Sequence, residues 1–485
     1  MINLIKNELT KVFKKKTIYI LLIITLGYVL LSNFIIKYTD NDHVRYYYYE
    51  GDIPYYEDAL ASLDPNNPTD YPQYLEYERQ LEAMKLTKEY GNNSWQAYVI
   101  NTKLISYIDV MIEHEYTNEV TEEAYNEATE KYNEGLKRMK ADDWKYFVTN
   151  DLEDINNSLK SQYQLRDSTD NPEALASINR TIQNLQLEKQ INEWRLEKNI
   201  SYAPSALNSS LENYQSYQTS VNEYANTDIS KLSDEEIQYY ESSLEQAALN
   251  KYYIENNISI ENDNRNILLN LFNNYELFIL IIAIVIASSI VSEEFSRGTI
   301  KLLLVKPYNR TKILISKFIV CILILILAII FLALSQLIIG GFIHGFDSLS
   351  TPAIIYNFET HSIQTMNIAS YVSLIGFCKL PIYLLLTTLA FACSTIFTNT
   401  ALAVAVPFLG YIASSLINQF ALLYDLKWII YFVTPNWDFT QYLFGGAPMF
   451  EGLTATFSLV ICLAYLFIML AISTVVFKKR DIKNI

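Results

Sequence analysis

The chain contains little glycine and proline, and only four of its 485 residues are cysteines. Cys321, Cys378, Cys393 and Cys462 all lie in apolar stretches, and none falls in the long polar segment 37–273. A disulfide framework for that segment is therefore excluded, and its stability must come from packing. The four histidines are isolated and no Cys/His cluster occurs, so the sequence predicts no metal site and no catalytic constellation.

A phosphate-binding loop of the GxxxxGK[ST] type is also missing. Such a loop holds the phosphates of ATP with backbone N–H groups, so we expect no cofactor bound by this chain in that manner. Nothing in the sequence indicates a nucleic-acid partner. The high usage of Asn, Ile, Lys and Tyr suggests a low-GC genome and hence a Gram-positive bacterium.

The residues that are present divide into two kinds of sequence. Segment 37–270 holds 43 acidic and 20 basic residues, a net charge of −23, whereas the remainder holds 10 acidic and 17 basic residues, a net of +7. Hydrophobic residues make up 51% of the chain and charged residues still reach 19%. Polar and apolar material must therefore be segregated into a soluble acidic domain and a membrane part.

Six apolar runs are long enough for the ~20 residues that a helix needs to cross a bilayer. We expect spans at 17–36, 275–291, 318–339, 370–397, 401–416 and 453–477. No small-x-small cleavage site follows Ile36, so the first run is interpreted as a retained signal anchor rather than a signal peptide. Lys379 within the fourth span is a functional candidate by default, and the alternative is a side chain that snorkels to the outer interface.

The distribution of lysine and arginine orients these spans. The basic residues near the span ends are Lys6, Lys11, Lys14, Lys15, Lys16, Arg297, Lys301, Lys306, Arg310, Lys312, Lys317, Lys478, Lys479, Arg480 and Lys483. A cytoplasmic N-terminus puts all of them on the inner side. The sequence thus predicts a multi-pass plasma-membrane protein with both termini cytoplasmic. The residues assigned to the membrane interface, in contact with lipids, are Lys14, Lys15, Lys16, Lys317, Lys478, Lys479 and Arg480.

Residues 1–16 carry apolar side chains at helical spacing opposite lysines. The apolar positions are Ile2, Ile5, Leu9, Val12 and Phe13. This pattern predicts an amphipathic helix lying on the cytoplasmic face of the membrane. A helical extension of the first span fits the same pattern.

The acidic insertion at 37–273 lies outside the cell in this topology. Helix signals dominate it, including Asn171 before Pro172 and a Ser233/Glu236 capping box. We expect an all-α extracellular domain of six or seven helices.

Two parts of the insertion depart from this pattern. Segment 37–72 carries most of its prolines and is expected to be irregular. The apolar stretch Trp95–Ile112 is interpreted as a core helix rather than a seventh span. Lys103 and Asp109 within it would each cost a few kcal/mol at bilayer depth.

The most informative stretch, the loop 293–312, links the second and third spans. Its candidate residues are Glu293, Glu294, Arg297, Gly298, Thr299, Lys301, Pro307 and Arg310. An acidic pair ends one span, a Gly-Thr step allows a tight turn, a short amphipathic helix follows, and a proline ends that helix. A helix lying across the cytoplasmic face suits docking to another protein, and the alternative is a basic loop that grips anionic headgroups.

With Lys317 opening the next span, this pattern resembles the permease subunits of ABC exporters of the type-two class. The basic N-terminal helix and the ending Phe477-Lys478-Lys479-Arg480-Asp481 are similar to that family as well. The resemblance covers residues 1–36 and 274–485 but not the insertion. It implies an all-α membrane protein with six transmembrane helices and an outer re-entrant segment at 424–446.

The resemblance also implies partners. A cytoplasmic ABC ATPase subunit would carry ATP and Mg²⁺, and a second permease would complete a homo- or heterodimer. The loop 293–312 would couple ATP hydrolysis to outward movement of a substrate such as an antimicrobial peptide or a lipid-like compound. The size of the insertion leaves an alternative: an ATPase-coupled signalling or scaffold protein that acts on an extracellular cell-wall partner.

Overall fold

The computed structural model describes residues 1–39, 47, 51–116, 120–224, 227–228, 231–260, 263–299, 309–397 and 399–480. The chain forms two compact units. The membrane unit comprises Met1–Asp40 and Asn262–Ile485, and the insert unit comprises Asn41–Glu261. The boundary coincides with the change from apolar to acidic sequence, because the two kinds of sequence bury their side chains separately.

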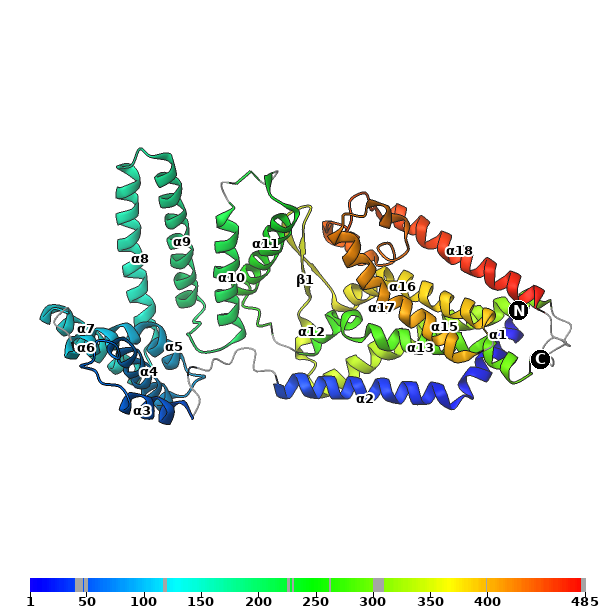
Figure 1. Cartoon of the computed structure of the whole chain (residues 1–485), viewed down its shortest axis with the longest axis horizontal. Helices are drawn as coiled ribbons and strands as arrows, with labels where there is room; N and C mark the ends of the chain where they lie inside the picture. The colour runs from blue at the N-terminus through cyan, green and yellow to red at the C-terminus, as the bar shows by residue number, and fades with distance from the viewer. Residues whose placement is uncertain are drawn as a thin grey trace. The chain divides into compact units, whose positions relative to one another are not determined.

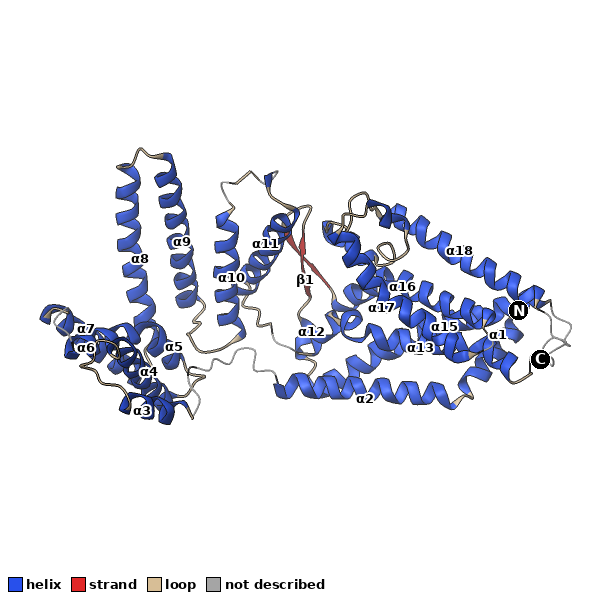
Figure 2. Ribbon diagram, viewed as in Figure 1, coloured by secondary structure: helices blue, strands red, loops and turns tan. Residues whose placement is uncertain are grey.

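The insert unit is helical throughout its described residues (Figures 1 and 2). Its helices are α3 (Asp52–Ala61), α4 (Tyr71–Tyr90), α5 (Trp95–Val99), the π-helix η1 (Ile100–Leu104), α6 (Ile105–Tyr116), α7 (Glu122–Lys140), α8 (Trp144–Asp167), α9 (Pro172–Glu197), α10 (Ala206–Glu223) and α11 (Asp234–Glu255). If α5, η1 and α6 count as one helix, eight are described, against the six or seven predicted. The expectation of an irregular 37–72 is wrong for α3. Its Pro54 lies in the first turn, where a missing N–H costs no hydrogen bond.

Both predicted helix starts are confirmed. The Asn171 side chain accepts a hydrogen bond from the Glu173 backbone N–H, with Pro172 as the first residue of α9. Ser233 and Glu236 form the reciprocal capping box that begins α11. Each cap satisfies backbone donors that the first helical turn cannot satisfy itself.

The stretch Trp95–Ile112 packs into one of the hydrophobic cores of the insert unit, as predicted for a core helix. Val99, Ile100 and Leu104 are fully buried there. Lys103, which argued against a seventh span, forms an ion pair with Asp151 across the unit, with Nζ 2.6 Å from Oδ1. The stretch is therefore an internal part of the insert unit, and its lysine is paired within that unit.

The membrane unit contains six helices that are long and apolar enough to cross a membrane. They are α2 (Lys16–Thr39), α13 (Leu271–Ser296), α15 (Arg310–His344), α16 (Ile368–Ile396), α17 (Thr400–Leu423) and α18 (Ala455–Lys479). Each of the six predicted spans overlaps one of them. Two shorter helices, α1 (Ile2–Phe13) and α12 (Asn264–Leu269), precede α2 and α13.

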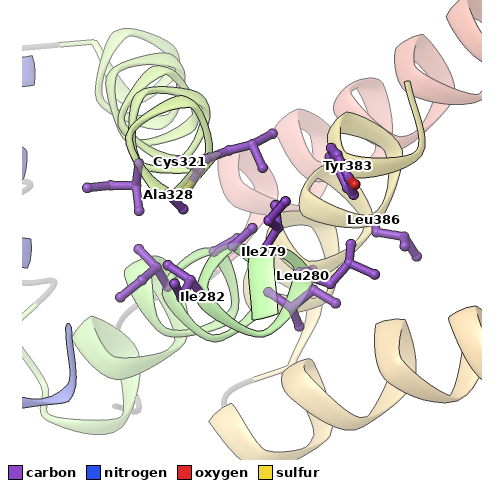
Figure 3. Close-up of a cluster of buried hydrophobic side chains, with 14 of the residues drawn as sticks. Ile279, Leu280, Ile282, Cys321, Ala328, Tyr383 and Leu386 are labelled. Atoms are coloured by element: carbon purple, nitrogen blue, oxygen red, sulfur yellow. The ribbon is translucent and has the colours of Figure 1, made fainter. Parts of the chain in front are cut away.

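Helix α13 is the centre of the membrane unit. In its most apolar window 72% of the residues are buried, against 11% in α18, so α13 is enclosed by protein while α18 exposes its apolar surface. Figure 3 shows Ile279, Leu280 and Ile282 of α13 between Cys321 of α15 and Tyr383 of α16. A charged residue on α13 must therefore find partners on neighbouring helices.

The connections at one end of the membrane unit contain elements that the sequence did not predict. Strands β1 (Ala353–Asn357) and β2 (Ser362–Met366) form an antiparallel hairpin, drawn in red in Figure 2, so the described fold is not purely helical. The predicted segment 424–446 contains two short 3-10 helices, η4 (Lys427–Tyr431) and η5 (Phe439–Gly445). The Phe358 backbone N–H donates to the Phe444 carbonyl and so joins the β-hairpin turn to η5.

Candidate functional site

The N-terminal helix α1 is separate from the first span. It ends at Phe13, and Lys14 and Lys15 connect it to α2, so the extension of the first span is the wrong alternative. Its buried face is formed by Leu4, Glu8 and Val12, one turn apart. A carboxylate on the buried face of a helix requires cationic partners, because an unpaired buried charge is strongly destabilising.

Those partners come from the motif that ends α13 and opens α15. Lys317 is completely buried, and its Nζ lies 2.6 Å from Glu8 Oε2 and 2.9 Å from Glu294 Oε1. The Lys317 ammonium also donates to the Ile290 carbonyl at 3.1 Å. All three donors of the ammonium thus have acceptors.

Two further lysines complete this group. Lys11 Nζ lies 2.6 Å from Glu8 Oε1 and 2.9 Å from Glu294 Oε1, and Lys15 Nζ lies 2.8 Å from Glu293 Oε2. We call the six residues Glu8, Lys11, Lys15, Glu293, Glu294 and Lys317 the α1 cluster. It contains three acids and three bases, so it is neutral as a whole and joins α1 to α13 and α15.

The α1 cluster shifts the pKa values of its α1 members. Burial raises the pKa of Glu8, but the charges of Lys317 and Lys11 and their hydrogen bonds outweigh burial and lower it below the ordinary value of 4.5. Burial lowers the pKa of Lys11, but hydrogen bonds to Glu8 and Glu294 outweigh it and raise the pKa above its usual range. Both groups are therefore held in their charged forms.

The structure corrects the interface assignment of Lys317. This lysine was assigned to the lipid interface, but its side chain is completely buried and engaged by carboxylates of the protein, while Lys15 is partly exposed and pairs with Glu293. Sequence reasoning missed Glu8, which was passed over as a polar position of an amphipathic helix. The available signal was its place between Leu4 and Val12, on the face that turns to the core.

The remaining motif residues lie at the end of α13. Arg297 is the C-cap of this helix, and Gly298 follows it with φ = +68°, which ends a helix readily because glycine has no Cβ to clash. The Thr299 hydroxyl donates to the Glu294 carbonyl at 3.4 Å. Lys301 and Pro307, together with the predicted amphipathic helix that carries them, lie outside the described residues.

Two arginines join the ends of α15, α16 and α18. Arg310 donates to the carbonyls of Lys478 and Arg480, at 3.0 and 3.4 Å. Arg480 donates to the Thr395 carbonyl at the end of α16 and lies 4.6 Å from the ring centre of Phe295. A cation at a helix C-terminus is favourable because the last carbonyls carry partial negative charge. Arg480 is thus a structural contact, while the other predicted interface residues Lys14, Lys16, Lys478 and Lys479 are exposed.

A cavity of about 480 Å³ opens beside the α1 cluster. Its lining residues are Asn7, Glu8, Lys11, Val12, Lys14, Lys15, Ser289, Ile290, Glu293, Glu294, Arg297 and Thr299. Most of the predicted motif within the described chain therefore surrounds one hollow, together with α1.

A second ionic group involves Lys379. Its Nζ lies 2.7 Å from Asp438 Oδ2 and 3.2 Å from Glu276 Oε2, and its side chain is 12% exposed. Tyr411 donates to the other Glu276 oxygen at 2.9 Å. We call Lys379, Glu276 and Asp438 the Lys379 triad. Two carboxylates hold the lysine, one from α13 and one from the N-cap of η5, so its charge is paired within the protein.

Helix α13 connects the two groups. Glu276 and Glu293 are 17 residues apart on it, which corresponds to about 26 Å at ~1.5 Å per residue. This distance is close to the ~30 Å hydrocarbon core of a bilayer. The membrane unit therefore carries one ionic group near each end of its central helix. Within the described residues, no group of three or more His, Cys, Asp or Glu side chains is suited to hold a metal ion.

The fold and these buried ionic groups define an α-helical membrane protein with six candidate spans. The chain belongs to the family described as "Protein of unknown function (DUF2705)", whose profile matches residues 241–483, half of the chain.

Two curated relatives come from Bacillus subtilis (strain 168). The "Uncharacterized protein YhcI" is 33% identical over 213 residues, which cover 44% of this chain and 67% of the relative. The "Uncharacterized membrane protein YdbK" is 30% identical over 202 residues, covering 42% of this chain and 77% of the relative. No solved structure matches.

Proposed function

We propose that this chain is the permease subunit of an ABC exporter, moving a substrate outward across the plasma membrane with a separate ATPase subunit. The observation that carries the proposal is the arrangement of the motif Glu293–Lys317. Its acidic pair and its lysine belong to one cluster, in which Glu294 contacts Lys317 directly, so the end of α13 and the first turns of α15 are joined beside the loop. A loop held at both ends would transmit a push from a docked ATPase to two spans at once.

The proposed topology places the α1 cluster in the cytoplasm and the insert unit outside the cell. The positive-inside bias supports this orientation. In this proposal a cytoplasmic ATPase subunit binds ATP and Mg²⁺, and a second permease completes a homo- or heterodimer. The segment 424–446 would form the outer re-entrant part, where η4 and η5 are short enough to turn back. The substrate would be an antimicrobial peptide or a lipid-like compound.

The test uses Gly298, which with Thr299 is among the last described residues before the predicted coupling helix. Co-expression of the full chain with the ATPase of the neighbouring gene should give a complex whose ATP hydrolysis exceeds that of the ATPase alone. Gly298→Trp should abolish this stimulation, since the bulky side chain would obstruct docking. No described atom lies within 4 Å of a Cβ at this position, so the change meets backbone strain at φ = +68° rather than a clash of its Cβ.

Gly345→Trp is the matched control. Gly345 also ends a helix with positive φ and open space around its Cβ, but at the other end of α15. A side chain there meets at least as much backbone strain, because φ = +93° with ψ = 169° is open essentially to glycine alone, and the variant should leave stimulation intact. Gly298→Asn, which tolerates the left-handed conformation, should retain most of the stimulation. Unchanged assembly and ATP hydrolysis in Gly298→Trp would refute the coupling role.

The insert unit favours a second candidate function: ATPase-coupled signalling or scaffolding toward an extracellular cell-wall partner. It is a compact unit with cores of its own, larger than a connection between two spans requires. Deletion of 41–261 with a short Gly-Ser linker between α2 and α12 distinguishes the two. Retained substrate efflux would favour the exporter, whereas intact ATPase coupling with lost control of a cell-wall partner would favour signalling.

A further inference from the structure

The cavity beside α1 is lined by basic side chains that the α1 cluster does not neutralise. The six residues of the cluster balance one another in the ion pairs described above. Lys14 and Arg297 also line the cavity, and neither side chain forms an ion pair with any residue that the structure describes. The residues that line the cavity therefore carry a net charge of +1, or +2 with the buried Lys317 of the α1 cluster, which favours an anionic ligand.

The polar lining suits a phosphate group. Lys15 Nζ already contacts the Ser289 hydroxyl at 3.1 Å, and Asn7 and Thr299 provide further polar side chains. Lysine and arginine are the side chains that bind phosphate oxygens by charge-assisted hydrogen bonds. With about 480 Å³, the cavity has room for a headgroup larger than an inorganic ion.

The cavity lies where a span begins, which favours a lipid over a soluble anion. Lys14 and Lys15 lead directly into α2, and the first turns of α2 expose the apolar side chains Tyr19, Ile20 and Ile23. On the other side, α1 exposes Ile2 and Phe13. A phosphodiester held by Lys14 and Arg297 would thus have acyl chains beside an apolar, outward-facing helix surface.

We propose that this cavity binds the phosphodiester headgroup of an anionic phospholipid such as phosphatidylglycerol. The headgroup lies between α1, the start of α2 and the end of α13, with Lys14 and Arg297 as its counter-ions. The lipid completes the packing of α1 against the membrane unit. This site does not depend on the exporter proposal, because it requires neither an ATPase nor a transported substrate.

The test is lipid retention by the purified full chain, measured by native mass spectrometry in detergent without any ATPase. We expect one phosphatidylglycerol to remain bound under conditions that remove phosphatidylcholine. The double variant Lys14→Gln/Arg297→Gln should bind phosphatidylglycerol at least roughly tenfold more weakly, because each basic residue near a lipid surface contributes about fivefold. Both side chains are exposed, so the variant should elute and unfold like the parent.

The control is Lys478→Gln/Lys479→Gln, which removes the same charge from exposed residues at the end of α18, outside the cavity. Equal losses in the two double variants would show general attraction to the bilayer and would overturn the site. Binding of inorganic phosphate without retention of phosphatidylglycerol would assign the cavity to a soluble anion and overturn the lipid. If neither binds, the two cations serve a protein partner instead, and the proposal fails.

Discussion

The two ionic groups on α13 both consist of lysines and carboxylates, but they differ in burial and net charge. In the α1 cluster, three lysines and three glutamates balance, and Lys317 at its centre has no exposed surface. In the Lys379 triad, one lysine faces two carboxylates, and Asp438 remains 35% exposed. Both groups have partly exposed members, since the Lys11 side chain is 41% exposed, but the α1 cluster is neutral around a fully buried lysine, whereas the triad carries a net negative charge.

The difference shows what each group holds in place. The α1 cluster joins three helices, and each of its glutamates already has a lysine partner, so loss of one member leaves buried charge behind. The triad joins α13 and α16 to Asp438, which caps the short helix η5 through the Thr440 backbone N–H. Water can reach part of the triad, so its lysine is easier to remove and its acids are easier to rearrange.

The largest expected effect is that of Lys317→Met, which keeps the side-chain length but removes the buried ammonium. Glu8 and Glu294 then lose their central counter-ion, and the free energy of unfolding should fall by about 3–5 kcal/mol. SDS titration of the full chain in mixed micelles measures this loss. Lys312→Met is the matched control, since Lys312 is exposed on the same helix and should change stability little. If Lys317→Met and Lys312→Met lower the free energy of unfolding by similar amounts, the burial of Lys317 in the α1 cluster does not contribute to stability as proposed.

Lys379→Met should have a smaller effect, about 1–3 kcal/mol in the same titration. Asp438 can be solvated, and Glu276 keeps the hydrogen bond from Tyr411, so less uncompensated charge remains buried. Lys427→Met is the control, because Lys427 is exposed on η4. A loss of stability as large as that of Lys317→Met would show that water does not compensate the carboxylates of the triad.

The smallest effect is the acid sensitivity of the α1 cluster. The pKa of Glu8 lies below 4.5 in the folded protein, so its contribution to stability is present above that pH and is lost as the pH falls through the folded pKa. Glu8→Gln should therefore reduce the drop in melting temperature that the parent shows when the pH is lowered from 7 to below 4.5.

Glu451→Gln is the control for this experiment, because Glu451 is an exposed carboxylate in the turn before α18. Glu451→Gln should leave the drop in melting temperature on acidification as large as in the parent. If the melting temperatures of the parent and Glu8→Gln fall equally as the pH is lowered, protonation of Glu8 does not account for the acid sensitivity of the cluster.

Much of the architecture could be predicted because it depends on local composition. Runs of apolar residues predicted the six spans, and the caps at Asn171 and Ser233 predicted two helix starts. Helix α3 and the hairpin at 353–366 were missed. The first was obscured by prolines, of which Pro54 in fact lies in its first turn, and the second is a short hairpin whose turn contains His361 with φ = +47°, a residue type that gives little warning.

The candidate site was predicted only in part. Glu293, Glu294 and Gly298 were singled out from their spacing, and they do line the cavity or end α13. Glu8 was missed because Lys317, its buried partner, is 309 residues away in the sequence, and no periodicity of α1 indicates that partner. The same distance explains why Lys317 was assigned to lipid headgroups.

The sequence by itself determined which segments are apolar, where helices begin, and how positive charge is distributed along the chain. These are properties of neighbouring residues, since hydrophobicity and capping act over a few turns. The tertiary structure alone decided which charges are buried together, because Glu8, Glu294 and Lys317 meet only after three helices pack. The local sequence around a lysine at the end of a span is the same whether the lysine contacts lipid or buried carboxylates. Only the packing of distant helices distinguishes the two environments.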